Sequence, residues 1–179
     1  MPGCKTKQKP FSLQGKPSTT TATKLTLMSQ SLMQMYVHLV FHRKCTAPDI
    51  LAEHQSEIHA YMAATLKQMG AHPIVVGGVG DHVHLLFSMP REHSMAEVVS
   101  KLKASTTRRL KEKDAVRYHG FFWQSGYGAF SVSPSRLSDT KNYILNQAEH
   151  HRRKSVREEY LQILNAYGVA YNEEYLLTD

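Results

Sequence analysis

The chain has 179 residues, a formal charge of +7 at pH 7, and 41% hydrophobic residues. This length favours one compact domain over two, and no apolar run approaches the roughly 20 residues that span a bilayer. Two cysteines, Cys4 and Cys45, make no disulfide framework and indicate a cytoplasmic protein. Residues 1–31 carry five lysines and no acid, so we expect a disordered basic extension over 1–31 and a single folded domain over 32–179.

Hydrophobic periodicity predicts six elements in the first part of the folded domain. They are strands at 35–42, 73–79, 82–87 and 121–132, and helices at 48–69 and from the capping box Ser94-Met95-Ala96-Glu97 onward. The first strand alternates apolar and polar residues, which predicts a half-buried strand. The order β-α-β-β-α-β predicts an α+β fold of the ferredoxin-like or RRM-like kind, a four-stranded antiparallel sheet with both helices on one face.

Two further helices are expected after Pro134. The first covers about 138–153 and would pack through Ile144, Leu145 and Ala148. The second begins at the capping box Ser155-Val156-Arg157-Glu158 and ends at Gly168. These helices are additional to the six-element core.

His82 and His84 are separated by one residue in the third predicted strand. Side chains at i and i+2 of a strand share a face, so both imidazoles can reach one ion. A divalent ion would need further ligands, such as a carboxamide or carboxylate oxygen. The alternative is a pair of partly exposed histidines on a solvated sheet surface. Asp81 either orients an imidazole or is a turn residue.

Tyr143 and Gln147 are four residues apart in a predicted helix and share a face. Their neighbours include several polar side chains, which a tyrosine packed in a core does not need. Because a phenol has a pKa of about 10, its attack on a phosphate needs a base or a metal ion. The pattern suggests phosphoryl transfer to a tyrosine hydroxyl, and a packing role is the alternative.

Several separate motifs resemble, in order and spacing, the single-tyrosine HUH transposases of the IS200-like type (transposase A). They are Tyr36-Val37-His38-Leu39-Val40-Phe41, Gly80-Asp81-His82-Val83-His84-Leu85-Leu86, Phe122-Trp123-Gln124-Ser125-Gly126-Tyr127-Gly128, Tyr143-Ile144-Leu145-Asn146-Gln147 and Glu159-Tyr160-Leu161. The resemblance extends over about residues 33–177.

The resemblance implies a role for each matching position. Tyr143 would be the nucleophile, and His82, His84 and Gln147 would bind a divalent metal, Mg²⁺ or Mn²⁺. The implied reaction is cleavage and rejoining of single-stranded DNA with hairpin ends, through a 5′-phosphotyrosine. The implied assembly is a homodimer in which the tyrosine helix of one subunit can complete the site of the other.

DNA contacts are expected from two basic groups of residues. They are Lys101, Lys103, Arg108 and Lys111 on the helix from Ser94, and His151, Arg152 and Arg153 after the tyrosine. For the first group the alternative is a helix face that is simply solvated. For the second group it is basic charge that complements the dipole at a helix C-terminus.

Aromatic residues at 121–127 either stack bases or, as we favour, pack in the core: Phe121, Phe122, Trp123 and Tyr127. We expect Cys45 to be a small buried hydrophobic residue. His38 could approach the metal site, but a satisfied sheet histidine is the preferred interpretation.

Other functions remain compatible with these residues. A related HUH nuclease, domesticated for host repeats or acting as a replication or conjugation nickase, would use the same site. A non-catalytic single-stranded nucleic-acid-binding module would use the same fold, with aromatic residues on the sheet face. A metal-dependent hydrolase that activates water would form no covalent DNA adduct.

Overall fold

The computed structural model describes residues 32–150 and 155–172. Its elements are β1 (Tyr36–His42), α1 (Ala52–Gln68), β2 (His72–Gly78), β3 (His82–Ser88), α2 (Met95–Lys113), β4 (Gly128–Val132), a 3₁₀ turn (Pro134–Arg136), α3 (Leu137–Leu145), α4 (Gln147–His150) and α5 (Val156–Ala166). The expectations for 1–31 and for His151, Arg152 and Arg153 lie outside the described residues. None of the described helices is long and apolar enough to cross a membrane.

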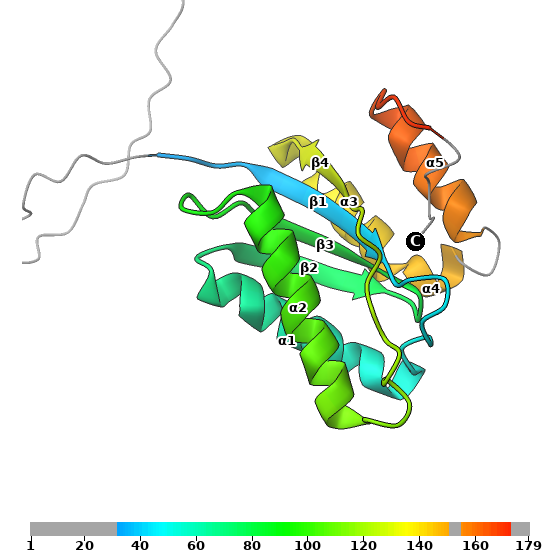
Figure 1. Ribbon diagram of the computed structural model, residues 1–179. Coiled ribbons are helices and arrows are strands. Elements are labelled where there is room, and N and C mark those ends of the chain that lie inside the picture. Colours follow the sequence, from blue (N-terminus) through cyan, green and yellow to red (C-terminus); the bar gives the residue numbers. More distant parts are fainter. Residues whose placement is uncertain (1–31, 151–154, 173–179) are drawn as a thin grey trace, which may run out of the picture. The chain divides into compact units, whose positions relative to one another are not determined.

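The four strands form one antiparallel sheet in the order β2-β3-β1-β4. Figure 1 shows α1 and α2 on one side of this sheet and α3, α4 and α5 on the other. The predicted α+β fold with a four-stranded antiparallel sheet is confirmed. The main core lies between the sheet and helices α1 and α2, where Leu39, Leu85 and Phe87 are fully buried beside Met62 and Leu102.

The second face of the sheet is also covered. Residues of α5 pack on β1 and β4 in a cluster with the members Val40, Phe130, Ile163 and Leu164. Ile144 of α3 packs against Leu86 and Val132. The prediction of a half-buried first strand is therefore wrong, because β1 is central in the sheet and has helices over both faces.

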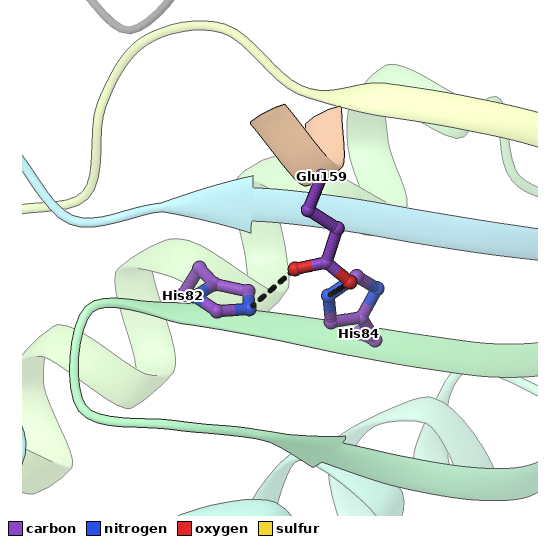
Figure 2. A group of neighbouring side chains, drawn as sticks. All are labelled: His82, His84 and Glu159. Carbon is purple, nitrogen blue, oxygen red and sulfur yellow. Dashed lines mark ion pairs between the residues drawn. The ribbon is translucent and has the colours of Figure 1, made fainter. Parts of the chain in front are cut away.

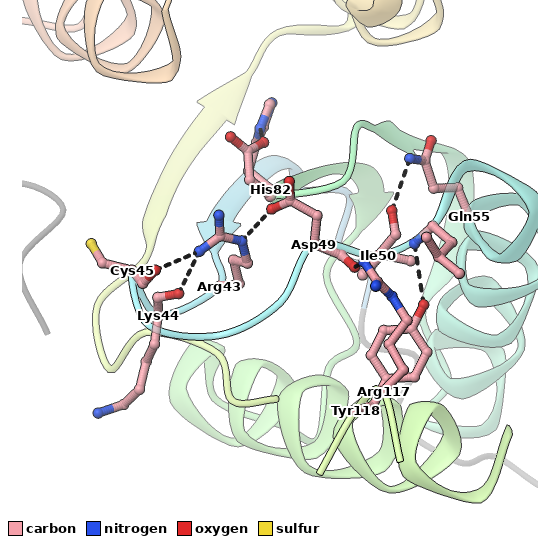
Figure 3. A network of polar contacts seen from close by, with 11 residues as sticks. Arg43, Lys44, Cys45, Asp49, Ile50, Gln55, His82, Arg117 and Tyr118 are labelled. Atoms are coloured by element: carbon pink, nitrogen blue, oxygen red, sulfur yellow. Dashed lines mark hydrogen bonds and ion pairs between the residues drawn. The ribbon is translucent and has the colours of Figure 1, made fainter. Parts of the chain in front are cut away.

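Helix α1 begins at Ala52, four residues later than predicted, because the preceding backbone makes other hydrogen bonds. The N–H of Ile50 donates to the carbonyl of Gly80 (2.8 Å), and that of Leu51 donates to the hydroxyl of Tyr118 (3.1 Å). Arg43 bonds to Asp49 (2.5 Å) and to the Lys44 carbonyl (2.7 Å) in the same network, which Figure 3 shows. This network ties the end of β1 to the turn that precedes β3.

Strand β4 begins at Gly128 rather than at residue 121, since the segment before it is a loop bound by a lysine. The ammonium group of Lys103 donates to the carbonyls of Gln124 (2.6 Å), Ser125 (3.2 Å) and Gly126 (2.7 Å). Three successive carbonyls that converge on one cation do not fit an extended strand. The prediction for Cys45 is wrong as well, because this residue is exposed in the turn after β1.

The predicted helix over 138–153 is interrupted at Asn146, which separates α3 from α4. Ile144 is buried as expected, but Leu145 is 59% exposed and Ala148 is exposed too. The predicted packing face is wrong for these two residues because the buried side of the segment includes Tyr143 and Gln147, which lie over the histidines of the sheet. Both predicted capping boxes are present, at Ser94 and at Ser155.

Candidate active site

His82 and His84 lie on the sheet face opposite the main core and are almost completely buried, at 1% and 0% exposure. The alternative of two partly exposed surface histidines is therefore excluded. The side chains between and after them, Val83 and Leu85, point into the main core, as the strand period requires.

Each of these imidazoles has a hydrogen-bond partner at its Nδ1 atom. Nδ1 of His82 lies 2.6 Å from Oδ1 of Asp81, and Nδ1 of His84 lies 2.9 Å from Nε2 of His38. Burial lowers the pKa of His38 to about 4, opposed in part by the charge of Glu159, so His38 is neutral at physiological pH. Donation from both Nδ1 atoms is the arrangement that orients histidine ligands toward a metal through Nε2.

Glu159 of α5 completes this group, and sequence reasoning missed it as a site residue. Its carboxylate is buried, with Oε2 3.7 Å from Nε2 of His82 and Oε1 3.6 Å from Nε2 of His84 (Figure 2). Two signals were available: Glu159 stands in the motif Glu159-Tyr160-Leu161 of the family resemblance, and it lies four residues before the apolar Ile163, on the same helix face.

Tyr143 and Gln147 meet at the same carboxylate despite the break at Asn146. The hydroxyl of Tyr143 donates a short hydrogen bond to Oε1 of Glu159, and the amide of Gln147 donates to the same oxygen at 2.7 Å. Burial, followed by the hydrogen bond and charge of Glu159, raises the pKa of the Tyr143 phenol, while the contact with Gln147 opposes this. The phenol is therefore protonated and has an acceptor for its proton in place.

The residues fit a divalent metal ion. One ligand atom from each of His82, His84 and Glu159 lies within 4.8 Å of the others. The buried Oε1 of Gln147 makes no hydrogen bond within the described part of the chain, so an amide oxygen is available as well. Two imidazole nitrogens with carboxylate and amide oxygens form a donor set that suits Mn²⁺, and Mg²⁺ through the oxygens.

An open cleft of about 620 Å³ leads from solvent to Tyr143 and His38. It is mostly lined by residues of β4, α3 and α5, including Ser131, Thr140 and Gln162, together with Arg136 of the 3₁₀ turn and Tyr167 after α5. A cleft of this size beside the Tyr143 side chain can admit a nucleotide-sized group.

The predicted DNA contacts on α2 lie on the far side of the sheet from the histidines. Lys103 is held by the loop carbonyls, and Lys111 lies 4.0 Å from the ring centroid of Phe122. Arg108 forms an ion pair with Glu112 at 3.8 Å, and Lys101 is exposed. The structure thus does not bring these residues into the candidate active site.

Comparison with known proteins places the chain in a family. Residues 31–147 match the family model described as "Transposase IS200 like". The chain is 26% identical over 121 residues to the ISDra2 transposase TnpA of Deinococcus radiodurans, covering 64% of this chain and 84% of that protein. The chain belongs to the IS200-like transposase family.

Solved structures agree with the fold. One is a crystal structure described as a transposase from Deinococcus radiodurans R1, with a TM-score of 0.53 and 20% identity over 69% of this chain and 98% of that one. Another is the REP-associated tyrosine transposase bound to a REP hairpin, with a TM-score of 0.51 and 12% identity over 87% of this chain and 94% of that one. At these identities the likeness concerns the fold.

Proposed function

We propose that this protein cleaves and rejoins single-stranded DNA in transposition, through a 5′-phosphotyrosine formed on Tyr143. The observation that carries the proposal is the hydrogen bond from the Tyr143 hydroxyl to Glu159, beside the paired histidines. A tyrosine with a carboxylate acceptor and an adjacent cation site has what nucleophilic attack on a phosphodiester requires.

The proposed reaction can be followed at named atoms. The phenolic oxygen of Tyr143 attacks the scissile phosphorus in line while its proton passes to Oε1 of Glu159. The bond between phosphorus and the 3′ oxygen breaks, and the leaving strand takes up a proton from solvent to become a 3′-hydroxyl. Attack by a second 3′-hydroxyl on the phosphotyrosine reverses the step and joins strands, so no nucleotide cofactor is consumed.

The other residues hold this arrangement. Asp81 and His38 orient the rings of His82 and His84, and Gln147 bonds to Glu159. His82, His84, Glu159 and Gln147 would hold Mg²⁺ or Mn²⁺, which when bound neutralises charge on the scissile phosphate. One carboxylate would take the proton and help to hold the ion: Oε1 accepts from Tyr143 and lies 3.6 Å from Nε2 of His84, and Oε2 lies 3.7 Å from Nε2 of His82.

Hairpin-bearing DNA and a homodimer belong to the same proposal. The hairpin is supported by the relative that was solved bound to one. Within one chain, Tyr143 already lies 5.9 Å from His84 between ring centroids, so exchange of the tyrosine helix is not needed to bring the two together. Light scattering of the free and DNA-bound protein tests the dimer.

Two alternatives lose support. The sheet face that a single-strand-binding module would use is covered by α3 and α5. A hydrolase that activates water does not require the contact between Tyr143 and Glu159.

The experiment that tests the proposal is a covalent-adduct assay. Labelled single-stranded DNA from the flanks of the gene, including its hairpins, is incubated with protein and Mg²⁺ or Mn²⁺ and separated on a denaturing gel. We expect an adduct that is lost with Tyr143→Phe or with chelator and retained with Tyr61→Phe, a matched change on α1. Cleavage without an adduct would point to activated water, and neither product across several flanks would refute the proposal.

A further inference from the structure

We propose that the groove between α2 and residues 122–127 binds unpaired nucleobases of the DNA strand by stacking on Phe122 and Tyr127. The inference rests on the proposed function, because it names where the single strand lies. The groove measures about 530 Å³. Its walls are residues of α2, with Lys103 and Thr107 among them, and of the loop from Phe122 to Tyr127.

The aromatic residues of this segment divide into two kinds. Phe121 and Trp123 are buried in the main core, at 0% and 6% exposure. Phe122 and Tyr127 are 50% and 40% exposed and line the groove. The sequence favoured core packing for all four, and the structure makes two of them available at the surface. Exposed rings beside cations are typical of proteins that bind single strands.

The loop that carries these rings is held in place. The Lys103 ammonium bonds to three of its carbonyls, and the N–H of Gln124 donates to the carbonyl of His42 at 2.9 Å. The carbonyl of Phe122 accepts from the N–H of Lys44 at 2.8 Å. Rings on a loop fixed at both the helix and the sheet lose little freedom when a base stacks on them, which favours binding.

The charge of α2 fits a polyanion. The helix carries six basic and two acidic residues. Arg109 and Lys113 are engaged by Glu57 of α1, at 2.8 and 2.6 Å, whereas Lys111 lies directly at the ring of Phe122. A phosphate next to a base stacked on Phe122 would meet this ammonium group. Duplex DNA is bound mainly through its phosphates and base edges, because its base faces are stacked on one another. Exposed rings therefore match unpaired bases better.

The same loop reaches the vicinity of the candidate active site. Gln124, which lines the groove, also lines a smaller cavity of about 240 Å³ together with His42 and Asp81. Asp81 is the partner of His82. A DNA strand that lies along residues 122–127 would therefore run from α2 toward the histidines.

The test is binding, measured in full-length protein with Tyr143→Phe so that no cleavage intervenes. Fluorescence anisotropy compares a labelled oligo-dT strand with a blunt linear duplex, which has no unpaired base. We expect Phe122→Leu and Tyr127→Leu each to weaken oligo-dT binding about fivefold or more, with duplex binding unchanged. Lys111→Gln should reduce the salt dependence of oligo-dT binding, while Lys67→Gln on α1 and Val116→Ala, an exposed apolar control, leave both unchanged.

Photocrosslinking of a strand containing 5-iodouracil gives an independent readout, with attachment expected at Phe122 or Tyr127. Unchanged oligo-dT affinity in both folded variants, with crosslinks elsewhere, overturns the inference. Equal weakening for the blunt linear duplex also overturns it, because the surface would then bind duplex. If the adduct assay fails but aromatic-dependent binding of oligo-dT persists, the proposed chemistry is refuted and the binding surface stands.

Discussion

Gly77 offers a test of how closely α3 must approach the sheet for the tyrosine to be in position. This residue of β2 pairs with His84 of β3 and faces α3. A Cβ atom added at Gly77 would lie 2.7 Å from the carbonyl oxygen of Ile144 and 2.9 Å from its Cγ2. Ordinary contact begins near 3.4 Å, so Gly77→Ala requires α3 to move by about 0.7 Å. Because Tyr143 precedes Ile144, this displacement passes to the proposed nucleophile.

Overpacking of this kind costs about 1–3 kcal/mol in the free energy of unfolding, equivalent to about 3–9 °C in Tm for a domain of this size. A nucleophile misplaced by about 1 Å loses up to about 100-fold in rate. We therefore expect Gly77→Ala to remain folded, to melt a few degrees lower, and to form the covalent adduct about 10- to 100-fold more slowly. Gly120→Ala is the control, since its Cβ would meet nothing within 4 Å. Adduct formation at the wild-type rate with an unchanged Tm would refute the reasoning.

Three further outcomes are expected. Ser94→Ala removes the N-cap of α2 and should lower the free energy of unfolding by about 1 kcal/mol in denaturant titrations, whereas Ser100→Ala in the same helix should not. Burial lowers the pKa of His59 to about 4. The unfolded chain thus takes up a proton below about pH 6.5 before the folded one does, and stability is lost as the pH falls from 6.5 to 4. His59→Gln should reduce that loss by up to about 3 kcal/mol. The measurement is the free energy of unfolding of the wild-type protein and of the variant, each at pH 6.5 and at pH 4. Lys103→Met should leave the carbonyls of residues 124–126 without their donor, and faster amide hydrogen exchange confined to this loop and its neighbours is the expected sign.

The parts of the fold that depend on local patterns could be predicted from sequence. Alternation and helical spacing gave the element order, and Ser94 and Ser155 marked two helix starts through their capping boxes. His82 and His84 were placed on one face by the strand period alone. Their burial did not follow, because it depends on α3 and α5, which pack on the sheet through contacts between residues distant in the chain.

The remaining errors have the same origin. Glu159 was missed because a single acidic residue in an amphipathic helix is ordinarily solvated, and only the position of α5 over the sheet buries it. The exposure of Leu145 and Cys45 and the break at Asn146 depend on what surrounds the segment rather than on its own periodicity. Spacing on a continuous helix placed Gln147 beside Tyr143, and the family resemblance implied its role as a metal ligand. It reaches the same carboxylate as Tyr143 although that helix is not continuous.

The position of Glu159 has a thermodynamic consequence. The helix that supplies this carboxylate also buries Ile163 and Leu164 against Val40 and Phe130. Binding of the proposed metal ion and docking of α5 are therefore coupled equilibria, and each must favour the other by the same free energy. The family match ends at residue 147, before this helix begins. A fragment cut at that boundary would keep both histidines and the tyrosine but would lose the element that couples ligand binding to the packing of the second sheet face.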